Sequence, residues 1–160
     1  MQMLYRRTTA AEVIELERDP DRAGHLVADG PPPRMLELGR AWHGIHFLLN
    51  GSAWGGDGPA FDAVLGGTAL GDPSSYEPVR LLVPDAVADV ARHLDRTGPA
   101  ELTPRFTHRA LQRAEVYPEA AWSEPDALTA FLLPAYARLA AFFAAAAAER
   151  DAVLITLDRT

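Results

Sequence analysis

The stretch LGRAWHGIHFLLNGSAWG, residues 38–55, holds two of the three tryptophans and two of the five histidines of the chain. Successive residues of an α-helix turn by about 100°, and at that spacing one apolar stripe runs along this segment. The stripe consists of Leu38, Ala41, Trp42, Ile45, Leu48 and Leu49. Phe47 falls on the opposite side, so the helix is expected to be covered on two faces. We therefore predict a core helix over residues 38–50, followed by a glycine-rich loop over residues 51–59 that carries Trp54.

The segments on either side of this helix predict both strands and further helices. Strand patterns occur at residues 3–7, 79–83 and 152–157, and Gly66-Gly67 predicts a tight hairpin between residues 63–65 and 68–70. Capping and periodicity signals predict helices over residues 10–18, 21–27, 84–96, 99–105, 108–114 and 123–148. In the last of these, Ser123 is expected to be the N-cap and Pro134 to kink the helix.

The order of these elements indicates the fold class. Strands and helices do not alternate regularly, which favours an α+β fold. We expect a single domain, residues 1–160, with a small mixed or mainly antiparallel sheet and helices packed mostly on one side. Residues 152–157 are apolar on both faces of a strand, so we expect them at the centre of the sheet.

Composition excludes several kinds of chemistry. The chain has no cysteine, which excludes disulfides, thiolate nucleophiles and cysteine-ligated metal centres. All fifteen basic residues are arginine, so Schiff-base lysine chemistry is impossible, and this usage indicates a high-GC genome. The net charge of −7 argues against a nucleic-acid partner, because phosphate binding depends on cationic side chains.

The apolar segments do not predict secretion or membrane insertion. Residues 1–9 lack the apolar core of a secretory signal. The longest apolar region, residues 127–148, is interrupted by polar residues and proline, and its unbroken part of about 10 residues is too short for a membrane span. We expect an acidic, soluble protein of the cytoplasm with no membrane partner.

His43 and His46 are the first candidates for chemistry, since a spacing of three residues places both rings on one helix face. A shared metal would need a third ligand such as Asp57 or Asp62. No His-Glu-x-x-His motif supports such a site, and we expect no metal and no cofactor. In the structural alternative, His46 is a half-buried ring bonded to a backbone carbonyl and His43 is exposed.

Other side chains are expected to converge on the same region. Trp42 and Trp54 would wall a cleft, and an acid–base enzyme would use His46 with Tyr76, Tyr117 or Arg80 there. Ser52 lacks the strand-to-helix context of a nucleophile elbow, so no catalytic residue is assigned. The candidate ligand- or partner-binding residues are Trp42, His43, His46, Trp54, Tyr76 and Arg80.

Four segments together resemble one bacterial family. They are RAWHGIHFLLNGSAW at residues 40–54, AVLGG at 63–67, VYPE at 116–119 and DAVL at 151–154. In this order they are similar to the YfbM-like family, a domain of unknown function of about this length. The resemblance implies an α+β fold and carries over no catalytic residue. Members usually have Asp-Lys where this chain has Gly39-Arg40, which removes the acidic neighbour of His43.

Two hypotheses on function follow. The first is a non-catalytic binding or accessory module, whose pocket near residues 42–54 takes a small ligand or a protein partner; an immunity or antitoxin-like role is one version. The alternative is a small metal-independent hydrolase or transferase with a histidine acid–base in the same cleft. Phe47 and the Ala-rich final helix are a possible homodimer face.

Overall fold

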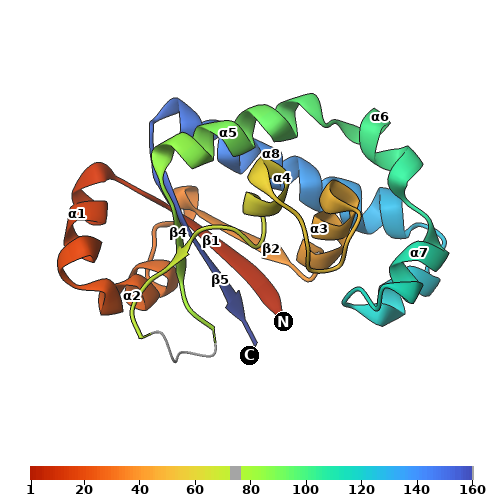
Figure 1. Ribbon diagram of the computed structural model, residues 1–160, viewed down its shortest axis with the longest axis horizontal. Helices are drawn as coiled ribbons and strands as arrows, with labels where there is room; N and C mark the ends of the chain where they lie inside the picture. Colours follow the sequence, from red (N-terminus) through yellow and green to blue (C-terminus); the bar gives the residue numbers. More distant parts are fainter. Residues whose placement is uncertain (73–76, 160) are drawn as a thin grey trace.

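Two strands from opposite ends of the chain form the centre of the sheet. The computed structural model describes residues 1–72 and 77–159 (Figure 1). Strand β1 (Gln2–Thr8) pairs antiparallel with β5 (Ala152–Asp158) along its whole length. Within the described residues the sheet has five antiparallel strands in the order β2-β1-β5-β4-β3. The predicted central position of residues 152–157 is confirmed.

The remaining strands are short. They are β2 (Met35–Gly39), β3 (Thr68–Ala69) and β4 (Arg80–Leu82). The longer helices are α1 (Ala10–Arg18), α3 (Trp42–Asn50), α5 (Pro84–Arg96) and α8 (Leu133–Ala148). The shorter ones are α2 (Ala23–Ala28), α4 (Gly58–Asp62), α6 (Pro99–Leu102) and α7 (His108–Arg113). Single 3₁₀ turns occur at residues 20–22, 32–34, 103–105 and 119–123.

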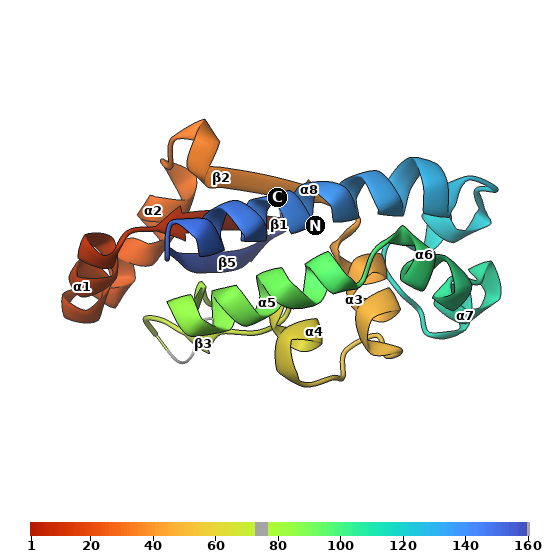
Figure 2. The same cartoon turned by 90° about the horizontal axis from the view of Figure 1, so that it is seen from above.

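The two faces of the sheet are covered unequally. Alternate residues of a strand point to opposite faces, so each strand contributes side chains to both. Met3, Tyr5 and Ile155 enter the larger core, to which α3, α5 and α8 contribute. Leu4 and Leu154 face the smaller core beneath α1 and α2. Figures 1 and 2 show α1 and α2 at one end of the molecule and α6 and α7 at the other. The α+β fold with helices mostly on one face is thus confirmed.

Several predicted helix ends are observed. Thr9 and Glu12 form the expected capping box at the start of α1, with each side chain bonded to the other residue's backbone N–H. Thr107 caps α7 by accepting a hydrogen bond from the N–H of Ala110. Pro84 opens α5, as its fixed φ and missing N–H favour.

The predicted helix over residues 38–50 begins later than expected. Leu38 and Gly39 are the end of β2, and the helix starts at Trp42. Leu36 and Leu38 point into the core, whereas Glu37 between them is exposed, so the strand period of two applies here. Gly39 has φ +70°, which turns the chain from strand to helix. The helix itself is buried on more than one face, as predicted.

The predicted hairpin at Gly66-Gly67 is wrong. Residues 63–65 continue from α4 as turns, and β3 pairs with β4 instead. The two glycines are needed for a different reason. A Cβ on Gly66 would overlap Asp62, and Gly67 has φ +96° and passes against the backbone of Leu81.

The final helix also starts differently from the prediction. Ser123 ends a 3₁₀ turn rather than capping a long helix, and a π-helical turn over Ala127–Leu132 leads into α8. Pro134 therefore lies in the first turn of α8, where its missing N–H is tolerated, and does not kink a continuous α-helix.

The segment Ala127–Ala148 is the one helical stretch of the described chain with the length and composition of a membrane span, at a mean hydropathy of 1.6. A core helix can have the same properties. Here one side of α8 buries Tyr136, Leu139 and Phe143 in the larger core, and Phe143 packs edge-on against Tyr5 of β1.

Candidate functional site

His43 connects α3 to the glycine-rich loop. Its Nε2 lies 2.8 Å from the carbonyl oxygen of Ala53, and its Nδ1 accepts a hydrogen bond of 2.9 Å from the N–H of Tyr117. A carbonyl only accepts, so Nε2 carries a proton, and Nδ1 carries none because it accepts. The ring is therefore neutral. The side chain is 1% exposed, which makes the expectation of an exposed His43 wrong.

His46 holds the same loop one turn further along α3. Its Nε2 donates to the carbonyl oxygen of Gly55 at 3.0 Å, and its Nδ1 lies 3.3 Å from the side-chain nitrogen of Asn50. Asn50 also donates to the carbonyl of Ala60, which ties the start of α4 to the same helix. The carbonyl bond agrees with the structural alternative for His46, although the ring is fully buried.

Burial keeps both imidazoles neutral. Loss of water lowers the pKa of His43 below its ordinary value, and it lowers that of His46 from 6.5 to about 4. All four ring nitrogens have hydrogen-bond partners, so neither ring has a nitrogen free to bind a metal or move a proton. Within residues 1–72 and 77–159 no group of three or more His, Asp or Glu side chains could hold a metal ion.

The pinned loop presents Trp54 at the surface. The indole of Trp54 is 63% exposed, although its ring packs 4.3 Å from that of His43 and 6.1 Å from that of Trp42. The planes of the two indoles are inclined at 54° to one another. Two backbone carbonyls beside Trp54 are anchored by buried histidines, so the course of the backbone at Trp54 is fixed.

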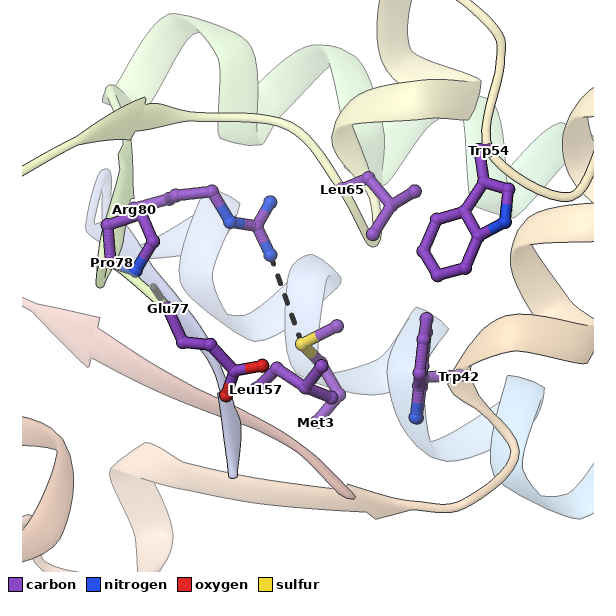
Figure 3. Close-up of a pocket in the computed structure, with 8 residues that line it drawn as sticks. All are labelled: Met3, Trp42, Trp54, Leu65, Glu77, Pro78, Arg80 and Leu157. Atoms are coloured by element: carbon purple, nitrogen blue, oxygen red, sulfur yellow. Dashed lines mark hydrogen bonds between the residues drawn. The ribbon is translucent and has the colours of Figure 1, made fainter. Parts of the chain in front are cut away.

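Trp42 and Trp54 wall one end of a pocket of about 200 Å³. We call this hollow the tryptophan pocket. Figure 3 shows the indoles at one end, Arg80 and Glu77 towards the other, and Met3 and Leu65 between them. The described residues that line it are Met3, Trp42, Trp54, Leu65, Glu77, Pro78, Arg80 and Leu157. Its walls are therefore mostly apolar, with one cation and one carboxylate.

Arg80 is held in place from β4. Its guanidinium donates to the carbonyl oxygens of Gly66 and Val64 and approaches the sulfur of Met3 at 3.9 Å. Burial lowers the pKa of Arg80, but an arginine remains charged at neutral pH. The same contacts fix residues 64–66, from which Leu65 projects into the pocket.

Three predicted candidates thus meet in one place, and others do not. Trp42, Trp54 and Arg80 line the tryptophan pocket, whereas His43 and His46 support its loop. Tyr76 lies outside the described residues, so its predicted place in the cleft stays a prediction.

Tyr117 packs 6.0 Å from the indole of Trp42 without lining the pocket. Its hydroxyl accepts hydrogen bonds from the N-terminal ammonium group and from Arg40. These two bonds, the one from the N-terminus foremost, lower the pKa of Tyr117. Its backbone N–H is bonded to His43, so the residue forms part of the support around α3.

Five lining residues were not among the sequence candidates: Met3, Leu65, Glu77, Pro78 and Leu157. Met3 and Leu157 are register partners on β1 and β5, so the pocket floor depends on the pairing of the chain ends. The sequence predicts both strands from their apolar residues, but this signal cannot show that a pocket lies above them.

Comparison with known proteins supports the resemblance seen in the sequence. The crystal structure of YfbM from Escherichia coli, described as a protein of unknown function, matches with a TM-score of 0.79 and 20% sequence identity, over 99% of this chain and 100% of that one. At this identity the likeness shows the shared fold alone. No curated protein matches the chain. The family model described as "Domain of unknown function (DUF1877)" matches residues 1–156. Because this match covers nearly the whole chain, the protein belongs to the DUF1877, or YfbM-like, family.

Proposed function

We propose that this protein is a non-catalytic binding module and that the tryptophan pocket is its binding site. The observation that carries the proposal is Trp54, a large apolar side chain 63% exposed at the edge of a pocket. An exposed indole beside a concavity is typical of a contact surface, because tryptophan contributes more binding energy than most side chains.

The rigidity of the loop supports the same proposal. His43 and His46 hold the carbonyls of Ala53 and Gly55, on either side of Trp54, and the N–H of Gly55 donates to Ser52. Holding the backbone of a binding loop in one conformation lowers the entropy lost on binding.

The alternative of a hydrolase or transferase is less well supported. Its acid–base would be His43 or His46, yet both rings are buried and neutral, and each nitrogen already has a partner. A general base must reach the proton that it removes. Neither histidine is among the described residues that line the tryptophan pocket.

The size of the pocket indicates a small ligand. Its volume of about 200 Å³ is below the range of roughly 300–1,000 Å³ found for drug-sized ligands. A small metabolite therefore fits this space better than a nucleotide or a long peptide does.

A fragment screen by saturation-transfer NMR tests the proposal. We expect fragments of the size of a substituted benzene to bind the wild-type protein and to bind Trp54→Ala several-fold more weakly. Ile14→Ala is the matched control, since Ile14 is an apolar side chain 50% exposed on α1 and away from the pocket. Absence of any binder, or equal binding to Trp54→Ala, contradicts the proposal. Chemical conversion of a bound fragment would instead support the enzyme alternative.

A further inference from the structure

Arg80 differs from the other arginines that are not exposed. Among the described residues these are Arg6, Arg7, Arg34 and Arg80. Arg6 lies 2.7 Å from a carboxylate oxygen of Glu12, and Arg7 and Arg34 lie 2.8 and 3.5 Å from those of Asp151. Arg80 has no carboxylate within 4.0 Å in residues 1–72 and 77–159.

A half-buried cation without an acidic partner is uncommon, because charges taken out of water are normally paired. Tyr5 is the ionisable side chain that interacts electrostatically with Arg80, but it is no anion. Burial raises the pKa of Tyr5, so its hydroxyl stays neutral and donates to the carbonyl of Ala63. The positive charge at the pocket is therefore balanced by no described side chain in contact with it.

The guanidinium also has hydrogen-bonding capacity left. An arginine has five N–H donors in a fixed fork. Described acceptors engage three of them, two through the carbonyls of Gly66 and Val64 and one through the weak contact to the sulfur of Met3. Two donors remain, and in Figure 3 the guanidinium projects into the pocket from β4. The remaining donors are at Nε and Nη1, and either one can donate a charge-assisted hydrogen bond to a carboxylate.

The walls between Arg80 and the indoles define the rest of the ligand. Met3 and Leu65 line the middle of the pocket, and the indoles of Trp42 and Trp54 close the far end (Figure 3). A flat apolar group can pack against the exposed indole of Trp54, beside Trp42, which is 1% exposed. A ligand that reaches from the indoles to Arg80 thus has an apolar body and one anionic end.

Glu77 limits the charge that this end can carry. Its carboxylate lines the same pocket and is paired with Arg159. A second negative charge on the ligand would be repelled by Glu77, whereas a single carboxylate can lie on the side of Arg80. The pocket therefore suits a monoanion better than a phosphate ester.

From these observations we infer that the tryptophan pocket binds a small monocarboxylate with a flat apolar body, whose carboxylate is held by Arg80. This inference rests on the proposed function, and it names the class of ligand. Benzoate is the simplest probe of the class, benzamide is its neutral isostere, and phenyl phosphate carries a second charge at pH 7.5.

Isothermal titration calorimetry with these three probes at pH 7.5 tests the inference. A charge-assisted hydrogen bond predicts that benzoate binds roughly tenfold to a hundredfold more tightly than benzamide. Phenyl phosphate is expected to bind more weakly than benzoate because of Glu77. Equal binding of benzoate and benzamide, or tighter binding of phenyl phosphate, overturns the inference.

Variants locate the effect. Arg80→Gln should bring the benzoate-to-benzamide affinity ratio close to 1, whereas Arg138→Gln, the same change of charge on the exposed side of α8, should leave it unchanged. If Arg80→Gln does not fold, Glu77→Gln serves instead. Removing that negative charge should raise the affinity for benzoate several-fold and leave benzamide unaffected, and a lower affinity for benzoate overturns the inference.

The two proposals fail in different ways. If fragments bind at Trp54 but show no preference for a carboxylate, the inference fails and the proposed binding function stands. If no fragment of any charge binds at Trp54, the proposed function fails and the inference fails with it.

Discussion

Acidification should destabilise this protein through His46 in particular. In the folded chain the buried ring has a pKa of about 4, whereas an unfolded histidine has its ordinary value of 6.5. As pH falls from 6.5 to 4 the unfolded chain takes up a proton that the folded chain does not. The stabilisation is therefore complete above pH 6.5 and is lost as the pH approaches 4.

The size of this effect follows from the difference in pKa. A shift of about 2.5 units corresponds to about 3 kcal/mol, at 1.36 kcal/mol per unit. The main physical cause is burial, which removes the charged ring from water, and the local geometry acts in the same direction. A protonated His46 would have an N–H at Nδ1 facing the side-chain nitrogen of Asn50, where the neutral ring has a lone pair. The pKa of His43 is lowered as well, and its titration acts in the same direction.

Urea denaturation of the wild type and of His46→Gln between pH 7.5 and 4 measures the effect. Glutamine keeps a donor for the carbonyl of Gly55 but does not titrate, so carboxylate titrations cancel in the difference between the two proteins. We expect His46→Gln to be less stable at pH 7.5, by about 1–2 kcal/mol for the lost packing and hydrogen bonding. By pH 4 its unfolding free energy should equal or exceed that of the wild type. Parallel stability curves for the two proteins across this range would refute the reasoning.

Two further predictions concern backbone positions. Gly44→Ala should lower the unfolding free energy by about 1–3 kcal/mol, because a Cβ there would lie 2.7 Å from Trp122. Gly24 has open space around it, so Gly24→Ala should raise the unfolding free energy by about 0.5–1 kcal/mol. Urea denaturation of both variants checks this, and destabilisation of both by similar amounts would contradict it. Thr9→Ala removes the capping box with Glu12 and should cost about 1 kcal/mol, seen as a melting temperature lower by a few degrees; an unchanged melting temperature would contradict a stabilising cap.

Local signals in the sequence predicted the elements that local physics determines. The apolar residues 152–157 form the central strand, and the capping residues Thr9 and Thr107 lie at the helix starts that they indicated. The errors arose where long-range pairing decides. Residues 38 and 39 continue a helical pattern in the sequence, but in the structure they belong to β2. The strand forms because β2 pairs with β1, which lies at the N-terminal end of the chain. The glycines at 66 and 67 are required by contacts with Asp62 and Leu81, not by a hairpin.

The candidate site was predicted in part for the same reason. Trp42, Trp54 and Arg80 could be singled out as unusual side chains near one helix and one strand, and they do line one pocket. That the two histidines support the loop follows from which carbonyls they meet, which no sequence spacing reveals. Glu77 lines the pocket because it precedes β4, which lies beside β5 in the sheet. The order of strands depends on tertiary pairing and cannot be read from the local sequence.

The three tryptophans allow the most direct test of the tryptophan pocket as a binding site. Trp42 and Trp54 line it, whereas Trp122 lies outside it, with its Nε1 bonded to the carbonyl of Val116. The measurement is a titration of ¹⁵N-labelled protein with benzoate, followed through the three indole N–H resonances. We predict that the resonances of Trp42 and Trp54 shift together along one saturation curve and that the resonance of Trp122 does not move. A saturating shift at Trp122 alone, or no shift at Trp54, would contradict the account.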